Sequence, residues 1–429
     1  MFNKLFVSTL SILILSFLGV GLLLAQGPTS QTRLSSDGAA VGTEQPTSNS
    51  SAPLPLHGQR ATLSPTTSAS IIEYTLPITP LNLLFGQNGE IWFSSFGGNA
   101  IGKLDLNLNR VSVYSRQGTG NVWGLKQDSQ GAIWFSTTNE DVVGKLEPSV
   151  GRFTEWHVPE THFGLDIDPT TGDIWFTTGG ILPGIYKLAP ATNSVTIWAT
   201  SPYTSVYDLG LGADGKVWFT VQPYGNQGVA NLTPTTNQVT IWRPPVTTGR
   251  PFRVDAKTAN EIWFTEFETT TNSIARLVPS ANTLSEFGVP TPNSNPGSLV
   301  MKGNSVWFTE MGTRKLGRLD PASSSPTTTV SSPITFPAVK TTSTILPISY
   351  TVTAQVTPTV MTTTPAPVAM ANGFTEISLP ASSGSLWDVG LAPVQGDVWF
   401  SERGINRIGR LTPQALGASL FLPLLIKGQ

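Results

Sequence analysis

Ile91-Trp92-Phe93 is the first copy of an apolar phrase that recurs along the chain and decides its fold. The seven copies are Ile91-Trp92-Phe93, Ile133-Trp134-Phe135, Ile174-Trp175-Phe176, Val217-Trp218-Phe219, Ile262-Trp263-Phe264, Val306-Trp307-Phe308 and Val398-Trp399-Phe400. Their tryptophans are 42, 41, 43, 45, 44 and 92 residues apart. A period in the forties with several short strands per unit is typical of a propeller, in which each unit buries its apolar faces against its neighbours.

Each repeat contains four short runs of β-branched and aromatic residues, separated by turn residues. In the first repeat the turn pair Asn88-Gly89 precedes the phrase, and runs at Ile101–Leu104 and Val111–Tyr114 follow it. This pattern predicts a four-stranded antiparallel unit. The phrase is apolar at consecutive positions, which indicates a strand covered on both faces, as in a blade packed between two others. We therefore predict an all-β, seven-bladed β-propeller with four antiparallel strands per blade, named A to D from the centre outward.

One run of the D type, Ile71–Leu76, precedes the first A strand, and the last repeat ends after its C run. An N-terminal strand that completes the last blade closes the ring without leaving an exposed edge. We therefore expect Ile71–Leu76 to pair with Arg407–Thr412.

The two ends of the chain differ in composition from the repeats. Leu5–Ala25 is an apolar stretch of 21 residues after Lys4, which predicts a signal peptide over residues 1–25 or, if uncleaved, an N-terminal anchor. Residues 26–70 are rich in Ser, Thr, Pro and Gly, as in a disordered stalk. The propeller is expected to span 71–413, and residues 414–429 to form an apolar tail too short to cross a bilayer.

A long insertion in blade six explains the spacing of 92 residues. The blade runs to Asp320-Pro321, and its D strand resumes at Phe374-Thr375-Glu376. Between them, residues 323–370 are rich in Thr, Ser, Pro and Val, with Lys340 as their only charged residue. Because long rim loops cost little entropy, we expect this low-complexity segment to project from the rim as a tether, an interaction or glycosylation loop, or filler, and to contribute little to stability.

Composition restricts the partners. Only 12% of residues are charged and the formal net charge is −2, so nothing favours nucleic acid, and a membrane would be contacted only through an uncleaved N-terminal segment. The chain has no cysteine, which excludes disulfides and thiolate metal sites. We expect a monomer that is secreted or extracytoplasmic, either free or tethered to the cell surface.

The ends of the phrase strands resemble a known family. Residues 263–266 and 307–310 read Trp-Phe-Thr-Glu, residues 399–402 read Trp-Phe-Ser-Glu, and Gly-Arg-Leu follows at 317–319 and 409–411. At this repeat length the motifs resemble the streptogramin B lyases of the virginiamycin B lyase family, over about residues 71–413. The resemblance implies a seven-bladed propeller and an enzyme that opens the ester of a cyclic peptide antibiotic by elimination, using Mg²⁺ and a histidine base.

Glu266, Glu310 and Glu402 end the phrase strands of three consecutive blades, at the mouth where propeller loops converge. Three carboxylates on one arc are candidate ligands for a hard cation, Mg²⁺ or Ca²⁺. Alternatively each is solvated or pairs with a basic neighbour, since the same blades carry Arg276, Arg318 and Arg410. Both interpretations stay open.

The histidines do not match the resemblance. The family has a histidine after a proline at the start of strand A in the blades that supply the acidic residues, and those positions here are Gly297 and Trp387. Of the three histidines, only His162 lies where it could reach the mouth, and a lone histidine is more often structural. Eliminating an ester needs a base near neutral pH, so no catalytic residue is assigned. A glutamate with a pKa raised by burial would serve only at a different site from that of the family.

The other mouth candidates carry aromatic, arginine and carboxylate side chains. They are Trp123, Tyr207, Asp208, Arg250, Arg253, Trp387, Asp388 and Arg403. Such groups suit a small polar ligand with flat faces, a peptide or a glycan, and they also suit an ordinary channel lining. We expect a recognition module, with two alternatives: a Mg²⁺-dependent carbon–oxygen lyase and a Ca²⁺-dependent propeller hydrolase or lactonase.

Overall fold

The computed structural model describes residues 68–412, except 159–162, 180–181, 201–204, 223–226, 245–248, 259, 268–271, 380–383 and 393–395. The predicted signal segment, the C-terminal tail, His162 and almost all of the predicted stalk therefore lie outside the described residues. Within the described ranges, no helix has the length and apolar character needed to cross a membrane.

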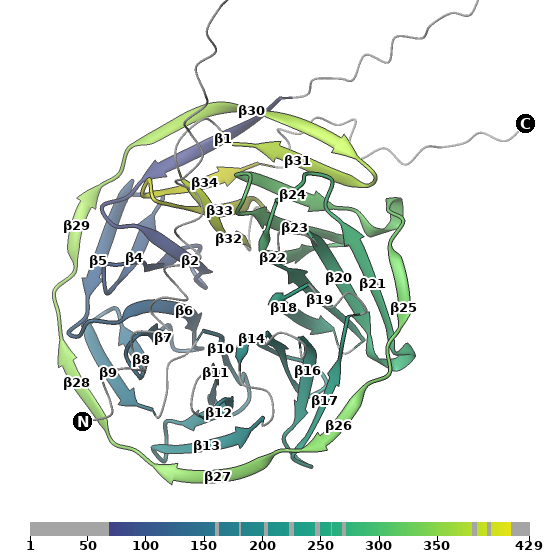
Figure 1. Ribbon diagram of the computed structural model, residues 1–429. Coiled ribbons are helices and arrows are strands. Elements are labelled where there is room, and N and C mark those ends of the chain that lie inside the picture. The colour runs from purple at the N-terminus through teal and green to yellow at the C-terminus, as the bar shows by residue number, and fades with distance from the viewer. Residues whose placement is uncertain are drawn as a thin grey trace, which may run out of the picture. The chain divides into compact units, whose positions relative to one another are not determined.

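The described residues form seven antiparallel blades around a common centre (Figure 1). Strands A to D are β2 (Pro80–Phe85), β3 (Ile91–Ser95), β4 (Ala100–Asp105) and β5 (Arg110–Ser115) in blade one; β6 (Asn121–Gln127), β7 (Ile133–Thr138), β8 (Val142–Glu147) and β9 (Arg152–His157) in blade two; β10 (Leu165–Ile167), β11 (Ile174–Thr178), β12 (Gly184–Ala189) and β13 (Ser194–Ala199) in blade three; and β14 (Val206–Leu211), β15 (Val217–Val221), β16 (Gly228–Thr233) and β17 (Gln238–Trp242) in blade four.

The remaining blades follow the same order. Their strands are β18 (Pro251–Thr258), β19 (Glu261–Glu266), β20 (Ser273–Val278) and β21 (Thr283–Gly288) in blade five; β22 (Pro296–Lys302), β23 (Ser305–Glu310), β24 (Lys315–Leu319) and β31 (Phe374–Ser378) in blade six; and β32 (Ser385–Leu391), β33 (Val398–Arg403), β34 (Arg407–Leu411) and β1 (Ser68–Thr75) in blade seven. Short 3-10 turns, η1 (Pro279–Ala281) and η2 (Pro321–Ser323), follow the C strands of blades five and six. The predicted all-β, seven-bladed fold is confirmed.

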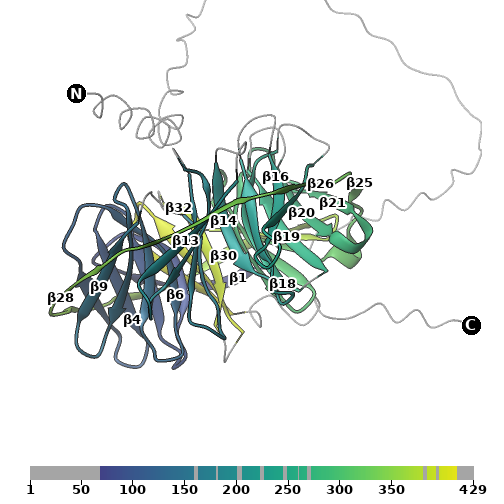
Figure 2. The ribbon, with the colours of Figure 1, turned by 90° about the horizontal axis from the view of Figure 1, so that it is seen from below.

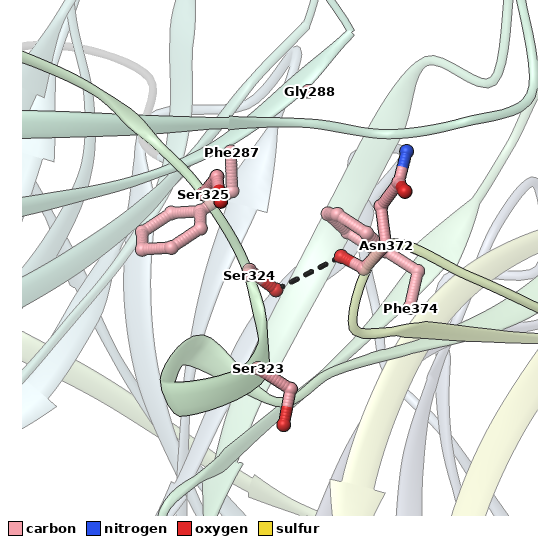
Figure 3. A pocket seen from close by; sticks show the side chains of 7 residues that line it. All are labelled: Phe287, Gly288, Ser323, Ser324, Ser325, Asn372 and Phe374. Atoms are coloured by element: carbon pink, nitrogen blue, oxygen red, sulfur yellow. Dashed lines mark hydrogen bonds between the residues drawn. The ribbon is translucent and has the colours of Figure 1, made fainter.

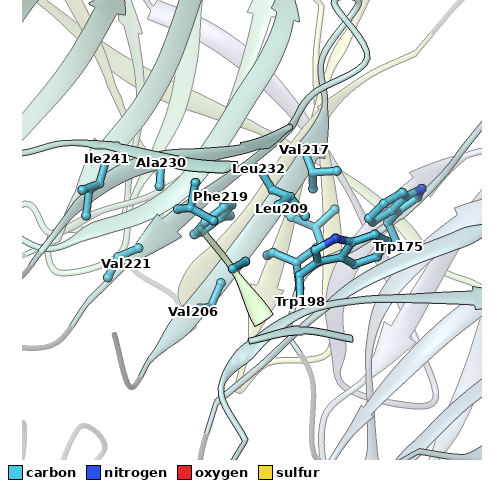
Figure 4. Packing of buried hydrophobic residues seen from close by; sticks show 13 residues of the cluster. Trp175, Trp198, Val206, Leu209, Val217, Phe219, Val221, Ala230, Leu232 and Ile241 are labelled. Carbon is cyan, nitrogen blue, oxygen red and sulfur yellow. The ribbon is translucent and has the colours of Figure 1, made fainter. Parts of the chain in front are cut away.

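The phrase residues are buried because strand B is covered on both faces. Seven apolar clusters lie between adjacent blades. In the cluster of Figure 4, Trp175 and Trp198 of blade three stack with ring centroids 5.1 Å apart, and Phe219 of blade four belongs to the same core. No blade buries its apolar face alone, as the repeat period predicts.

A glycine in strand C explains the Gly-Lys-Leu and Gly-Arg-Leu motifs. Gly102 pairs with Phe93, and a Cβ added to Gly102 would lie 2.1 Å from that ring. Gly317 makes the same close approach to Phe308, at 2.2 Å. The phenylalanine of the phrase therefore lies directly on the backbone of the next strand, where a side chain would have no room.

A hydroxyl after each Trp-Phe pair links the blades at their inner ends. In all seven blades this Ser or Thr accepts a backbone N–H from its own A strand or, in blade three, from Gly164 just before it, at 3.0–3.2 Å; the hydroxyls belong to Ser94, Ser136, Thr177, Thr220, Thr265, Thr309 and Ser401. In turn, Thr220 donates to the carbonyl of Phe252 in the next blade at 3.2 Å, and Ser401 donates to that of Leu81 at 2.6 Å. The innermost strands are thus held to one another around the ring.

The predicted ring closure is confirmed. β1 pairs with β34 in the register Ile71↔Leu411 to Thr75↔Arg407. β1 begins at Ser68, so it takes in the last three residues of the predicted stalk.

The expectation for the insertion is wrong. Residues 323–371, which we call the strap, do not project from the rim; they run once around the outside of the ring and add a fifth strand to the blades (Figures 1 and 2). Its strands are β25 (Thr327–Val330), β26 (Ile334–Pro337), β27 (Val339–Thr344), β28 (Pro347–Thr351), β29 (Gln355–Pro358) and β30 (Met361–Ala371). They pair in turn with the D strands of blades five, four, three, two and one, and β30 pairs with both β1 and β31. Because a D strand presents an unpaired edge, a segment without an apolar pattern can still dock there through its backbone.

Candidate functional site

A β-bulge near the start of strand A positions most of the mouth candidates. The register between strands A and B shifts at Pro80/Leu83, Val122/Leu125, Val206/Leu209, Pro251/Val254, Pro296/Leu299 and Leu386/Val389. Two residues lie inside each shift, and bulges of this kind re-aim side chains. Trp123, Tyr207, Asp208, Arg253, Trp387 and Asp388 all occupy these bulges.

The first bulge residue is aromatic in blades two, four, five and seven, and these rings, together with Phe163 of blade three, form what we call the aromatic layer. Trp123 lies edge-on to Phe163 at 5.2 Å and to Trp387 at 5.5 Å between centroids. Phe163 stacks on Tyr207 at 4.1 Å, and Tyr207 contacts Phe252 at 5.1 Å. Trp123 belongs to blade two and Trp387 to blade seven, so rings from blades that are not neighbours meet over the centre.

A cation lies against this layer. The guanidinium of Arg403 is 3.6 Å from the ring centroid of Phe96 and 5.3 Å from that of Trp387. Burial lowers the pKa of Arg403 from its ordinary value, which indicates a partly desolvated charge. The indole N–H groups of Trp123 and Trp387 are buried and have no hydrogen-bond partner among the described residues.

The polar second bulge residues form a layer whose side chains bond to one another and to the inner strands, although Arg253 Nε is buried and has no partner among the described residues. Arg253 donates to Asn82 Oδ1 at 2.6 Å and to Asp208 Oδ1 at 3.4 Å, so it joins blades one, four and five. Asp388 accepts the N–H of Leu83 at 2.6 Å and the hydroxyl of Ser298. Burial raises the pKa values of Asp208 and Asp388, and the nearby Arg253 opposes that shift. These candidates tie the inner strands together and line a cavity of ≈ 200 Å³.

Arg250, the last of the described mouth candidates, lies outside these two layers. The carbonyl of Arg250 accepts the N–H of Phe267 at 2.8 Å, which places Arg250 beside the end of β19. Within the aromatic layer, burial raises the pKa of Tyr207 to about 12, so its hydroxyl stays neutral. Phe96, Phe163 and Phe252 belong to the site although sequence reasoning missed them. Phe163 and Phe252 precede Gly164 and Arg253 at the same position as Trp123 and Tyr207, and that shared position was the available signal.

Glu266, Glu310 and Glu402 are at most 1% exposed and do not converge. Each faces a second glutamate within its own blade, namely Glu286, Glu376 and Glu73. Burial, reinforced by the second carboxyl group, raises the pKa of Glu266 to about 8, of Glu310 to about 7 and of Glu402 to about 8. In the part of the chain that the structure describes, no group of three or more His, Cys, Asp or Glu residues has a geometry suited to a metal ion.

The arginines of these blades have other partners. Arg276, Arg318 and Arg410 lie over the rings of Trp263, Trp307 and Trp399 at 5.6, 6.0 and 5.6 Å. They pair with Glu261, Asp320 and Asp397 at 3.4, 2.7 and 2.5 Å. The arginines therefore stabilise the phrase tryptophans. The glutamates instead have Ser273, Thr313 and their paired carboxyl groups as neighbours.

Solved structures with this architecture include streptogramin lyases. A streptogramin B lyase structure is similar with a TM-score of 0.61 and 22% identity, over 80% of this chain and 97% of that chain. The virginiamycin B lyase from Staphylococcus aureus is similar with a TM-score of 0.60 and 21% identity, over 80% of this chain and 98% of that chain. The same values hold for its catalytically inactive variant with quinupristin. At these identities the likeness shows the fold.

Family models give a more specific result. No curated protein matches the sequence. A model described as a two component regulator propeller matches residues 117–139. The model of the virginiamycin B lyase family matches residues 193–415, which is more than half of the chain. This chain belongs to the virginiamycin B lyase family.

Proposed function

We propose that the protein is an exported recognition propeller that binds a peptide-like ligand with flat faces on its aromatic layer, without opening an ester. The observation that carries the proposal is the layer itself, in which rings from blades two, three, four, five and seven meet beside the Arg403 guanidinium. A desolvated guanidinium on aromatic faces favours flat, electron-rich groups.

The family positions for the base argue against catalysis. Gly297 occupies the position in blade six, where an added Cβ would lie 2.8 Å from both Met311 Cγ and Thr309 Oγ1. Trp387 occupies the position in blade seven and forms part of the aromatic layer. Among the described residues the one histidine is His157, on the exposed side of an outer strand. Neither position offers an imidazole to take a proton.

The raised pKa of Glu310 favours the lyase alternative. Burial raises this pKa to about 7, which suits a general base. Its complete burial argues against that role, since a base must contact the proton that it removes. The hydrolase or lactonase alternative needs a carboxylate-held Ca²⁺, and the three glutamates do not converge on one ion.

The test uses quinupristin as the peptide probe and a neutral oligosaccharide as the second probe, each titrated while tryptophan fluorescence is recorded. We expect saturable binding of the peptide probe. Trp387→Ala should weaken it by about 2 kcal/mol, roughly thirtyfold in Kd, because buried aromatic anchors dominate such sites. Tyr114→Phe, in the outer strand of blade one, is the matched control and should bind normally. Trp387-dependent binding of only the oligosaccharide would identify the ligand as a glycan, and no Trp387-dependent binding of either probe contradicts the proposal.

A turnover assay separates recognition from catalysis. Eliminative opening of a cyclic ester leaves the mass unchanged, so the product must be followed by chromatography. We expect no enzymatic opening of quinupristin with Mg²⁺. Opening that needs Mg²⁺, stops with a chelator and falls in a folded Glu310→Gln variant would establish the lyase instead.

Export is part of the same proposal and is supported by Lys4 followed by the apolar residues 5–25. Fractionation of cells that express the full chain, followed by N-terminal sequencing, tests it. A mature N-terminus near residue 26 in the extracytoplasmic fraction supports cleavage. An intact N-terminus in the membrane fraction supports a tether, and an intact chain in the cytoplasm contradicts export.

A further inference from the structure

The strap repeats with a period of seven residues, one unit for each blade. The backbone N–H groups of Ser331, Ala338, Ile345, Val352 and Thr359 each donate to a carbonyl in the C–D turn of a successive blade, at 2.7–3.1 Å. The acceptors are Asn282, Asn237, Asn193, Gly151 and Asn109, all in the left-handed conformation. Ala366 continues the series and is fully buried beside β1.

Strap side chains follow the same period. The hydroxyls of Thr328, Thr335, Thr342 and Ser349 each form a hydrogen bond with a D-strand hydroxyl, at 2.9–3.1 Å. Seven extended residues span roughly 23 Å, and strap donors seven residues apart bond to successive blades. The strap, residues 323–371, holds 49 residues, or seven for each of the seven blades. Its length therefore matches one turn of this ring.

The two ends of the strap meet at blade six (Figure 3). Ser324 Oγ donates to the carbonyls of Asp320 and Asn372, both at 3.1 Å. The N–H of Asp320 donates to the carbonyl of Gly373 at 2.9 Å. The strap is thus a loop with its ends fastened together and the other blades inside it.

The strap also covers the seam of the ring. Blade seven combines both ends of the propeller, because β1 is its outer strand. β1 is hydrogen-bonded to β34 on one edge and to β30 on the other, in the register Ser68↔Pro367 to Tyr74↔Met361. β30 continues onto β31 of blade six, which joins both blades into one nine-stranded sheet. Opening the seam on the outer side therefore requires that β30 separate as well.

We propose that the strap is a clasp that docks after the ring has closed and then slows its opening. Its partners are the D strands of all seven blades, including β1 from the start of the propeller and β31 from beyond the strap. The complete docking surface therefore exists only on a closed ring. Interactions that form after the folding transition state slow unfolding and leave the folding rate unchanged.

The first test replaces residues 324–371 with a three-residue turn and measures unfolding and refolding rates in denaturant by tryptophan fluorescence. We expect the shortened protein to fold at a similar rate and to unfold faster by on the order of a hundredfold. An unchanged unfolding rate overturns the proposal. A shortened chain that does not fold also overturns it, because the ring would then need the strap in order to close.

The second test keeps every contact and removes only the continuity of the loop. A protease site is inserted after Leu346, which is 79% exposed between β27 and β28, and it is cut in the folded protein. The matched control carries the same site between Asp214 and Gly215, in the A–B turn of blade four, far from the strap along the sheet. We expect the nicked strap to unfold more than tenfold faster than the nicked control. Equal unfolding rates of the two nicked proteins would overturn the proposal that the closed strap slows the opening of the ring.

Discussion

The ring and the strap are both β structure, but they are stabilised in different ways. The ring buries aromatic and branched side chains in seven clusters between blades. The strap leaves most of its large apolar side chains exposed, namely Val330, Ile334, Val339, Leu346, Ile348, Val356, Val360, Met361 and Met370. It is held by backbone pairing, by a backbone N–H donated to a C–D turn at every seventh position from Ser331 to Thr359, and by a few long side chains. An outermost strand thus needs the right spacing more than an apolar face.

The largest effect is expected from a phrase tryptophan of the ring. Trp218 is fully buried and stacks on Trp242 at 5.5 Å. Trp218→Ala should lower the free energy of unfolding by about 3–5 kcal/mol, because the cavity cannot collapse between two blades. Equilibrium denaturation measures it, with the exposed Leu108→Ala as control. A loss below about 1 kcal/mol would mean that side-chain burial does not dominate the ring.

A smaller effect is expected where the strap has a side-chain anchor. The Tyr350 ring stacks on Phe153 at 5.4 Å, and its hydroxyl donates to Glu155 at 2.6 Å beside the buried Arg116. Tyr350→Phe should destabilise the protein by about 1.5 kcal/mol, because that hydrogen bond goes to a charged group. Stopped-flow kinetics should place the loss in the unfolding rate. A slower folding rate instead would show that the strap docks before the transition state.

The contrast between ring and strap also explains what the sequence could predict. The Trp-Phe phrase repeats with its turns and fixes blade number, strand order and the pairing of residues 71–76. The low complexity of the strap predicts a loop, although the segment forms six strands. Its signal was the spacing of Thr328, Thr335, Thr342 and Ser349, which is seven residues each time. That period reflects the distance between blades, which a search for helical or alternating patterns does not detect.

The site could be predicted only in part, for a physical reason. The repeat places Trp123, Tyr207 and Trp387 at the start of strand A, and the structure brings their rings into one layer through Phe163. The bulge could not be inferred, and it decides which residues join the aromatic layer and which join the polar layer. The position of Glu266, Glu310 and Glu402 at the ends of B strands does not show that each is buried beside a second glutamate of its own blade, which keeps them apart.

Three buried glutamates of the ring predict that the stability of the protein depends on pH, whereas the strap has no such group. The folded pKa values of Glu266 and Glu402 are raised to about 8, and that of Glu310 to about 7, from 4.5. The folded protein therefore holds more protons than the unfolded chain between these values. Stability from these groups is full below about pH 4.5 and is lost as pH rises through about 8, at up to about 1.4 kcal/mol per pH unit for each proton.

Thermal unfolding between pH 5 and 8 checks this dependence. Glu402→Gln, which is neutral at every pH, should flatten the decline, whereas Lys340→Gln, at the single charge of the strap, should leave it unchanged. Stability that rises over this interval would contradict the paired, protonated carboxyl groups.

The smallest effect is expected for one strap hydroxyl. Thr335 and Thr240 form an exposed hydrogen bond of 2.9 Å. Thr335→Val keeps the shape and the strand propensity, so the loss should be about 0.5 kcal/mol. Denaturation of the double variant Thr335→Val/Thr240→Val should show no further loss. Additive losses of about 1 kcal/mol or more would mean that strap side chains matter beyond their pairing.

Amide hydrogen exchange of the native protein tests the central claim most directly. The amides of Ser331, Ala338, Ile345, Val352 and Thr359 are the strap donors to the C–D turns of five blades. If the strap is one docked clasp, these amides are protected and exchange with one common opening free energy, below that of the B-strand amides of the ring. Exchange at the rate of an unprotected chain, or five unrelated opening energies, would contradict it.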